Sequence, residues 1–182
     1  MIHMIKLEEN KRIIIDLLKS TNRPNIDKLI KALEKNDYFE APASTIYHLH
    51  VPGGLAYHSL SVYNTLKKLN DIFNINIPQE SLIIVGLLHD VCKINIYAWN
   101  DESKMYYKKS QAPKEHGTRS IQMLKQVIEL TEKEEYMIRW HMNHYTWDGN
   151  FKSNENNIKK KCPEAYLAYF ADHISTLFLE EE

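Results

Sequence analysis

The stretch from Ser81 to Leu88 is apolar on nearly every side, and it ends in the adjacent pair His89 and Asp90. A segment this apolar belongs in the interior of a folded protein. The pair therefore carries a carboxylate into that interior, where an unpaired charge costs on the order of several kcal/mol. A bound cation would remove this cost, since imidazole nitrogen and carboxylate oxygen are common ligands of Zn, Mn, Fe and Mg. A neutral histidine beside a salt-bridged or helix-capping aspartate is the alternative.

Two further apolar segments carry side chains of the same kind. Asp172 lies in the middle of a nearly all-apolar helical pattern over residues 165–179. His58 lies early in a helix that is predicted after Gly53 and Gly54. Ligands on separate helices that converge in a bundle core are the usual construction of a helical metal site. Three segments far apart in the sequence therefore offer potential metal ligands.

This set of residues resembles the HD superfamily of metal-dependent phosphohydrolases. The superfamily's order His…His-Asp…Asp is found here at His58, His89, Asp90 and Asp172. Other matching blocks are Gly-Leu-Leu-His-Asp-Val-Cys-Lys, Glu-His-Gly-Thr-Arg-Ser and Tyr-Phe-Ala-Asp-His-Ile-Ser. The likeness extends over about residues 40 to 180. It is similar in particular to the HD half of YhaM-type exoribonucleases and to small stand-alone HD proteins of bacteria and their phages.

The resemblance implies a metal cofactor. The implied ligands of a first ion are His58, His89, Asp90 and Asp172. His116 and His141 match positions at which some branches of the superfamily hold a second ion. Beside a single ion, these two histidines would instead bind phosphate or donate protons. We therefore expect one or two divalent ions, with Mn, Fe, Mg, Zn and Ni as the candidates.

Lys93 follows His89 by four residues, so a continuing helix would direct both side chains the same way. In HD proteins of the His-Asp-x-x-Lys type this lysine reaches the scissile phosphate, whereas a surface lysine at a helix end is the alternative.

His144 follows His141 by three residues, where two-metal branches show adjacent histidines. His144 can therefore ligate metal, contact phosphate or remain solvated. The predicted catalytic residues are Asp90, Lys93 and His116. The predicted substrate contacts are Lys93, His144, His48 and Arg119.

Two of the predicted substrate contacts, His48 and Arg119, lie on other segments of the chain. His48 and His50 lie on the loop that leads to His58, and alternation along an extended chain would direct both to one side, toward the mouth of a pocket. Arg119 is an anion-binding candidate, although a surface charge is more often simply solvated.

Charge and cysteine content narrow the functional classes. The 182 residues hold 23 Lys and Arg against 24 Asp and Glu, so no basic field recruits nucleic acid, and stable binding of duplex DNA is not expected. The two cysteines do not make a disulfide framework. No amino-terminal signal sequence is recognisable, and no apolar run approaches the roughly 20 residues of a membrane span. We expect a cytoplasmic protein without membrane contact; its oligomeric state is left open.

The pattern of elements predicts an all-α fold, a compact HD-domain helical bundle with a small β-hairpin around residues 94–112. We expect one HD domain over residues 1–182, with N-terminal helices in 1–40 and the metal-site core in 41–182. A loop is predicted over 148–161. Besides the helix of His58 and one that begins at Pro163, we predict helices over residues 7–19, 26–33, 79–91, 116–130 and 131–145.

The function that this resemblance implies is metal-dependent hydrolysis of a phosphate ester by metal-activated water. The expected substrate is a phosphate mono- or diester of a nucleotide, an oligonucleotide or an RNA end. A nucleotide-binding regulatory module that holds its ligand without turnover is the alternative. Oxygen activation by paired iron, which a few HD proteins perform, is a third interpretation.

Overall fold

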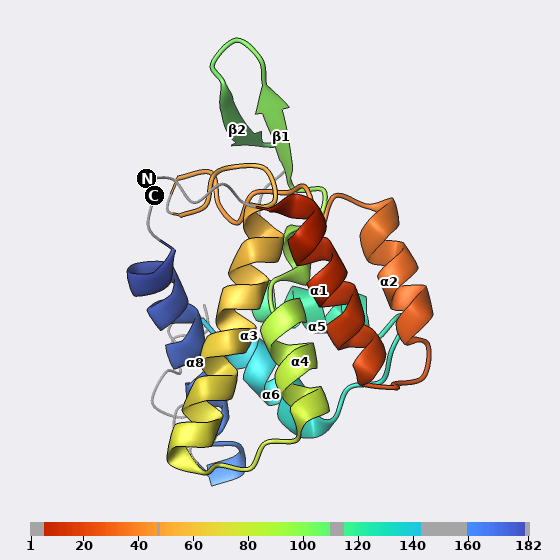
Figure 1. Cartoon of the computed structure of the whole chain (residues 1–182), viewed down its shortest axis with the longest axis vertical. Coiled ribbons are helices and arrows are strands. Elements are labelled where there is room, and N and C mark those ends of the chain that lie inside the picture. The colour runs from red at the N-terminus through yellow and green to blue at the C-terminus, as the bar shows by residue number, and fades with distance from the viewer. Residues whose placement is uncertain (1–5, 47, 110–114, 143–159, 181–182) are drawn as a thin grey trace.

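The protein is described here by a computed structural model, which places residues 6–46, 48–109, 115–142 and 160–180. Its helices pack side by side into a bundle, and a two-stranded hairpin protrudes from the upper end (Figure 1). The hairpin consists of β1 (Tyr97–Asn100) and β2 (Met105–Lys108), which are antiparallel. The predicted all-α bundle with a hairpin inside residues 94–112 is therefore confirmed. Within the described residues, no helix combines the length and the apolar character that crossing a bilayer demands.

Two helices form the centre of the bundle, α3 (Gly54–Phe73) and α4 (Gln79–Leu88). Every residue of α4 from Ser81 onward is buried, as its apolar sequence predicts. The two helices approach closely because Gly86 faces Tyr63, and a Cβ atom at Gly86 would lie only 2.5 Å from the Cα atom of Tyr63. Only glycine fits at such a crossing. The close approach brings the start of α3, with His58, near the end of α4.

The remaining helices surround this pair. Helix α8 packs against both α3 and α6, and α1 packs against α3 and α4 (Figure 1). A π-helical turn, η2, follows α8 directly. The bounds of these elements are α1 (Leu7–Ser20), α2 (Ile26–Lys35), α5 (His116–Leu124), α6 (Glu132–Trp140), α8 (Ala165–Ile174) and η2 (Ser175–Leu179).

Three predicted helices are shorter in the structure. The helix predicted over 79–91 ends at Leu88, because Asp90 adopts φ −108° and ψ 18°, outside the helical region, before the 3₁₀ turn η1 (Val91–Lys93). The helix predicted over 116–130 ends with α5 at Leu124. Thr131 then starts α6 with a capping box, which requires a non-helical residue at that position. Helix α6 ends at Trp140, and the predicted loop over 148–161 lies almost wholly outside the described residues.

A buried ion pair ties α6 to the turn before α2. The Glu134 carboxylate accepts two hydrogen bonds of 2.7 Å from the Arg23 guanidinium and one of 2.8 Å from the Ser81 hydroxyl. The Glu134 side chain is 0% exposed and that of Arg23 only 8%. Burial opposes ionisation of this carboxyl, but the hydrogen bonds from Arg23 and Thr131 outweigh it and lower the pKa of Glu134. The carboxylate is therefore charged and fully paired.

We expect Glu134→Ala to lower the free energy of unfolding by about 3 to 5 kcal/mol, because it leaves the Arg23 guanidinium partly buried without its partner. Urea unfolding followed by circular dichroism measures this change. Glu132→Ala is the matched control, because Glu132 is an exposed residue of the same helix, and its effect should stay within about 0.5 kcal/mol. Equal effects of the two substitutions would contradict a stabilising role for the buried pair.

Candidate metal centre

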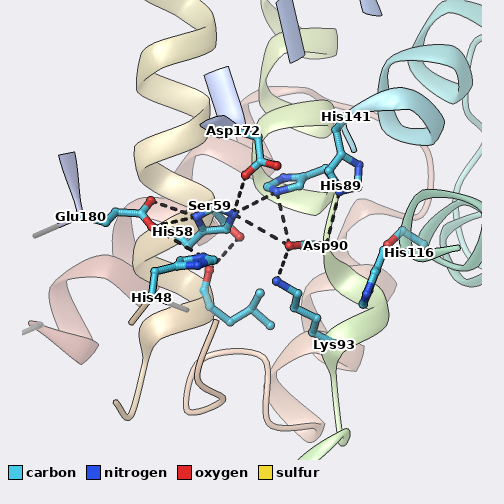
Figure 2. Close-up of polar contacts among 12 residues, drawn as sticks. His48, His58, Ser59, His89, Asp90, Lys93, His116, His141, Asp172 and Glu180 are labelled. Carbon is cyan, nitrogen blue, oxygen red and sulfur yellow. Dashed lines mark hydrogen bonds and ion pairs between the residues drawn. The ribbon is translucent and has the colours of Figure 1, made fainter. Parts of the chain in front are cut away.

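Side chains from four helices converge at one buried point in the bundle (Figure 2). One comes from the first turns of α3, two from the end of α4, one from the end of α6 and one from α8. All five residues are at most 8% exposed. They are His58, His89, Asp90, His141 and Asp172.

The four predicted ligands of a first metal ion lie within a few ångströms of one another. The Nε2 atoms of His58 and His89 are 3.3 Å apart, and Asp172 Oδ1 lies 3.2 Å from His58 Nε2. Asp90 Oδ2 lies 3.9 Å from His58 Nε2 and 3.7 Å from His89 Nε2. The structure thus brings together residues that are more than a hundred positions apart in the chain.

His141 extends this cluster on the far side of Asp90. Its Nε2 atom lies 3.6 Å from Asp90 Oδ1, and its ring centroid is 4.8 Å from that of His89. The two carboxylate oxygens of Asp90 therefore face different partners. Oδ2 faces His58 and His89, and Oδ1 faces His141.

Each imidazole of the cluster is held at its Nδ1 atom and directs Nε2 inward. His89 Nδ1 lies 3.0 Å from the Gly86 carbonyl oxygen, and His141 Nδ1 lies 2.7 Å from that of Ile138. His58 Nδ1 instead lies 2.9 Å from the carboxylate of Glu180. An imidazole that donates its Nδ1 proton keeps the Nε2 lone pair available for a cation.

The residues present fit a divalent cation. Asp90 Oδ1 and His141 Nε2 are buried, and neither has a hydrogen-bond partner among the described residues, since 3.6 Å is too long for one. Unpaired buried polar atoms are costly and rare. Ligand atoms of His58, His89 and Asp172 lie within 4.8 Å of one another, as do those of His89, Asp90 and His141. A cation among these nitrogen and oxygen atoms would satisfy the unpaired ones.

The metal-free cluster holds a proton that a bound cation would displace. Burial lowers the pKa of His89 to about 3, so this ring is neutral. Burial acts the same way on His58, but Glu180 and Asp172 outweigh it and raise its pKa to about 10. Although burial opposes ionisation of Asp90, Lys93 and the nearby imidazoles hold its pKa well below the usual range. Binding of a cation would therefore displace a proton from His58.

Lys93 lies beside the cluster, although not on the continuing helix that its spacing predicted. The turn η1 carries its Nζ atom to 2.7 Å from Asp90 Oδ2, and its side chain is 12% exposed. Burial opposes its charge, but Asp90 outweighs it and raises the pKa of Lys93. The ammonium group is therefore charged at a partly accessible position.

His116 lies on another side of Asp90, at the start of α5. Its Nδ1 atom is 3.4 Å from the Sγ atom of Cys92. Ligand atoms of Asp90, Cys92 and His116 lie within 4.8 Å of one another. Burial lowers the pKa of His116 and raises that of the Cys92 thiol to about 12, so the ring is neutral and the thiol is protonated.

A cavity of about 450 Å³ opens onto the cluster. Lys93 and His116 lie on its wall, with Tyr97 and Lys108, which lie opposite each other at the base of the hairpin. Exposed apolar side chains also line it, among them Ile46. The cavity gives solvent and small molecules access to the buried ligands.

The weaker substrate-contact predictions have different outcomes. His48 lines the cavity, and both of its buried ring nitrogens lack a hydrogen-bond partner among the described residues. His50 is exposed and does not line the cavity, because Leu49 has φ 45° and interrupts the expected alternation. Arg119 is exposed and also does not line it. His144 lies outside the described residues.

Two residues of the site were missed by the sequence interpretation. The sequence around Lys108 does not indicate a role in the site, because only the hairpin register brings this residue opposite Tyr97 at the cavity. Glu180 begins a run of three glutamates, a pattern typical of solvated chain. No local pattern could have indicated its contact with His58, which lies 122 positions away.

One comparison with known proteins identifies a relationship. A family model described as the HD domain matches residues 55–177, which span all five residues of the buried cluster. No solved structure matches the chain.

Proposed function

Because this chain belongs to the HD-domain family, we propose that it hydrolyses a phosphate mono- or diester of a nucleotide, an oligonucleotide or an RNA end. Membership places it among metal-dependent phosphohydrolases. The observation that carries the finer proposal is the arrangement of the site, in which three inward-facing imidazole Nε2 atoms and two buried carboxylates lie beside a lysine ammonium at an accessible cavity. The likeness to YhaM-type exoribonucleases supports a substrate that contains a nucleotide.

In this proposal His58, His89, Asp90 and Asp172 hold one divalent cation. Asp90 would contribute to both groups of candidate ligands, because Oδ1 faces His141 while Oδ2 faces the other two histidines. His141 and His116 are the candidate ligands of the second ion. When bound, such cations act as Lewis acids toward a phosphoryl oxygen and lower the pKa of a coordinated water.

Lys93 is proposed to stabilise negative charge on the phosphoryl oxygens. Its ammonium group lines the cavity and is fixed at 2.7 Å from Asp90, so it is already oriented when substrate arrives. A preorganised cation in a partly buried site stabilises developing charge more than one in water. His48 lies at the same cavity with no hydrogen bond from either ring nitrogen among the described residues, and it is proposed to contact the substrate.

His116 is proposed to donate a hydrogen bond to the substrate, in addition to being a candidate ligand. The protonated Cys92 thiol can donate to His116 Nδ1 at 3.4 Å, which leaves the imidazole proton on Nε2. The Nε2–H group of this neutral imidazole can donate a hydrogen bond to a phosphoryl or leaving-group oxygen. In this tautomer His116 does not ligate metal through Nε2, so the thiol contact favours the hydrogen-bonding role over ligation.

The test is a hydrolysis screen on protein reconstituted separately with Mn²⁺, Mg²⁺, Zn²⁺, Fe²⁺ and Ni²⁺. Its substrates are an aryl phosphodiester, an aryl phosphomonoester, nucleotides, cyclic dinucleotides and short RNAs. We expect hydrolysis of at least one nucleotide-containing ester, which a chelator abolishes and added metal restores. Metal binding without hydrolysis of any ester would reject the proposal in favour of a regulatory module.

A further inference from the structure

Glu180 is a buried carboxylate in a segment that otherwise exposes its apolar side chains. Its side chain is 0% exposed, whereas Leu177, Phe178 and Leu179 directly before it are 66%, 69% and 50% exposed. This is the reverse of the ordinary partition between water and protein interior. A specific interaction must therefore hold the carboxylate inside.

That interaction is with His58. The two Glu180 carboxylate oxygens lie 2.9 and 3.1 Å from His58 Nδ1, on the side of the ring opposite to the buried cluster (Figure 2). His48 Nε2 lies farther away, at 3.8 Å, and burial lowers the pKa of His48 to about 4, so this ring is neutral. A separation of 3.8 Å is too long for a hydrogen bond, so His58 is the partner of Glu180.

The backbone places this carboxylate through the π-helical turn η2. The Glu180 amide donates to the Ser175 carbonyl oxygen at 3.1 Å, a five-residue closure that ends the turn. The buried Ser175 hydroxyl donates to the Thr65 hydroxyl on α3 at 3.2 Å. The turn is thereby anchored to the same helix that carries His58.

The partner of His58 differs in kind from those of the other two cluster histidines. His89 and His141 are each held by a neutral backbone carbonyl, whereas His58 is held by a charged carboxylate. A carboxylate is the stronger acceptor, and it both fixes the ring and increases the electron-donating strength of the opposite nitrogen.

We propose that Glu180 is a positioning residue that holds His58 with Nε2 directed into the metal centre and strengthens cation binding there. It acts through His58 and does not touch the substrate. The inference rests on the proposed function only in taking His58 as a metal ligand.

The test measures metal affinity without substrate. Apo protein is titrated with Co²⁺ in competition with a chelating dye, and the visible absorption of the bound Co²⁺ is recorded. We expect Glu180→Gln, which keeps an acceptor oxygen but loses the charge, to raise the Kd for Co²⁺ about tenfold, and Glu180→Ala to raise it about 100-fold. The Co²⁺ absorption band should shift in both variants, because the field of the His58 ligand changes.

Glu8→Gln is the matched control, since it removes the same charge from an exposed position of α1, and its Kd should stay within about twofold of wild type. Urea unfolding of each apo variant shows whether the fold is intact, and Glu180→Gln serves as the conservative variant if Glu180→Ala fails to fold. An unchanged Kd and an unchanged Co²⁺ spectrum in Glu180→Gln would overturn the role of Glu180. Failure of the wild type to bind Co²⁺ would instead count against the metal site itself.

Discussion

Asp90→Asn is expected to lower kcat by roughly three orders of magnitude. The substitution removes the negative charge of a carboxylate that lies between His58 and His89 on one side and His141 on the other. Asp90 Oδ2 faces His58 and His89, and Oδ1 faces His141, so no other described residue can replace it. Asparagine has the same shape, and the fold should therefore persist. The measurement is kcat on the best substrate of the screen, together with Mn²⁺ per chain by elemental analysis.

Wild-type protein is expected to hold up to two equivalents of Mn²⁺ at saturation and the Asp90→Asn variant fewer than one. Saturation of the wild type at one equivalent would reject the two-ion form of the proposal. Asp27→Asn, at an exposed position of α2, is the matched control and should leave both quantities unchanged. Wild-type kcat in Asp90→Asn would place the chemistry elsewhere in the molecule.

Lys93→Ala is expected to lower kcat by about 100- to 1,000-fold while the bound metal is retained. The ammonium group is placed to offset phosphoryl charge but is not a metal ligand. Lys93 also holds the pKa of Asp90 down, so the substitution raises that pKa. The His141 imidazole continues to favour the carboxylate, which should therefore still bind metal at neutral pH.

The control for Lys93→Ala is Lys104→Ala. It removes an ammonium group from the exposed turn of the hairpin and should leave kcat unchanged. Lys93→Arg keeps the charge but changes its geometry, so it should recover only part of the rate. If Lys93→Ala loses metal in parallel with rate, the lysine serves Asp90 as a structural partner rather than the phosphate.

Much of the candidate site follows from strong local signals. The apolar run that ends at His89 and Asp90 predicted a buried helix, and the structure buries every residue from Ser81 to Leu88. Such a run can be stable only inside the protein, so the burial of its terminal pair could be predicted without coordinates. The bundle and the hairpin followed in the same way, from periodicity and turn residues.

Helix ends and cavity contacts were predicted less well. The helix expected over residues 79–91 ends at Leu88, and the expected alternation at His48 and His50 is interrupted by Leu49. In both places one residue leaves the regular backbone conformation. Periodicity describes the average direction of side chains along an element, and it carries little information on where an element stops.

The sequence by itself determined which segments are buried, which helices form and which polar side chains those helices carry inside. Only the tertiary structure decided how these side chains meet. The approach of Gly86 to Tyr63 brings α3 and α4 together, and the π-helical turn directs Glu180 to His58. The physical reason is that burial is read from short stretches of chain, whereas contacts over such sequence separations depend on how whole helices pack.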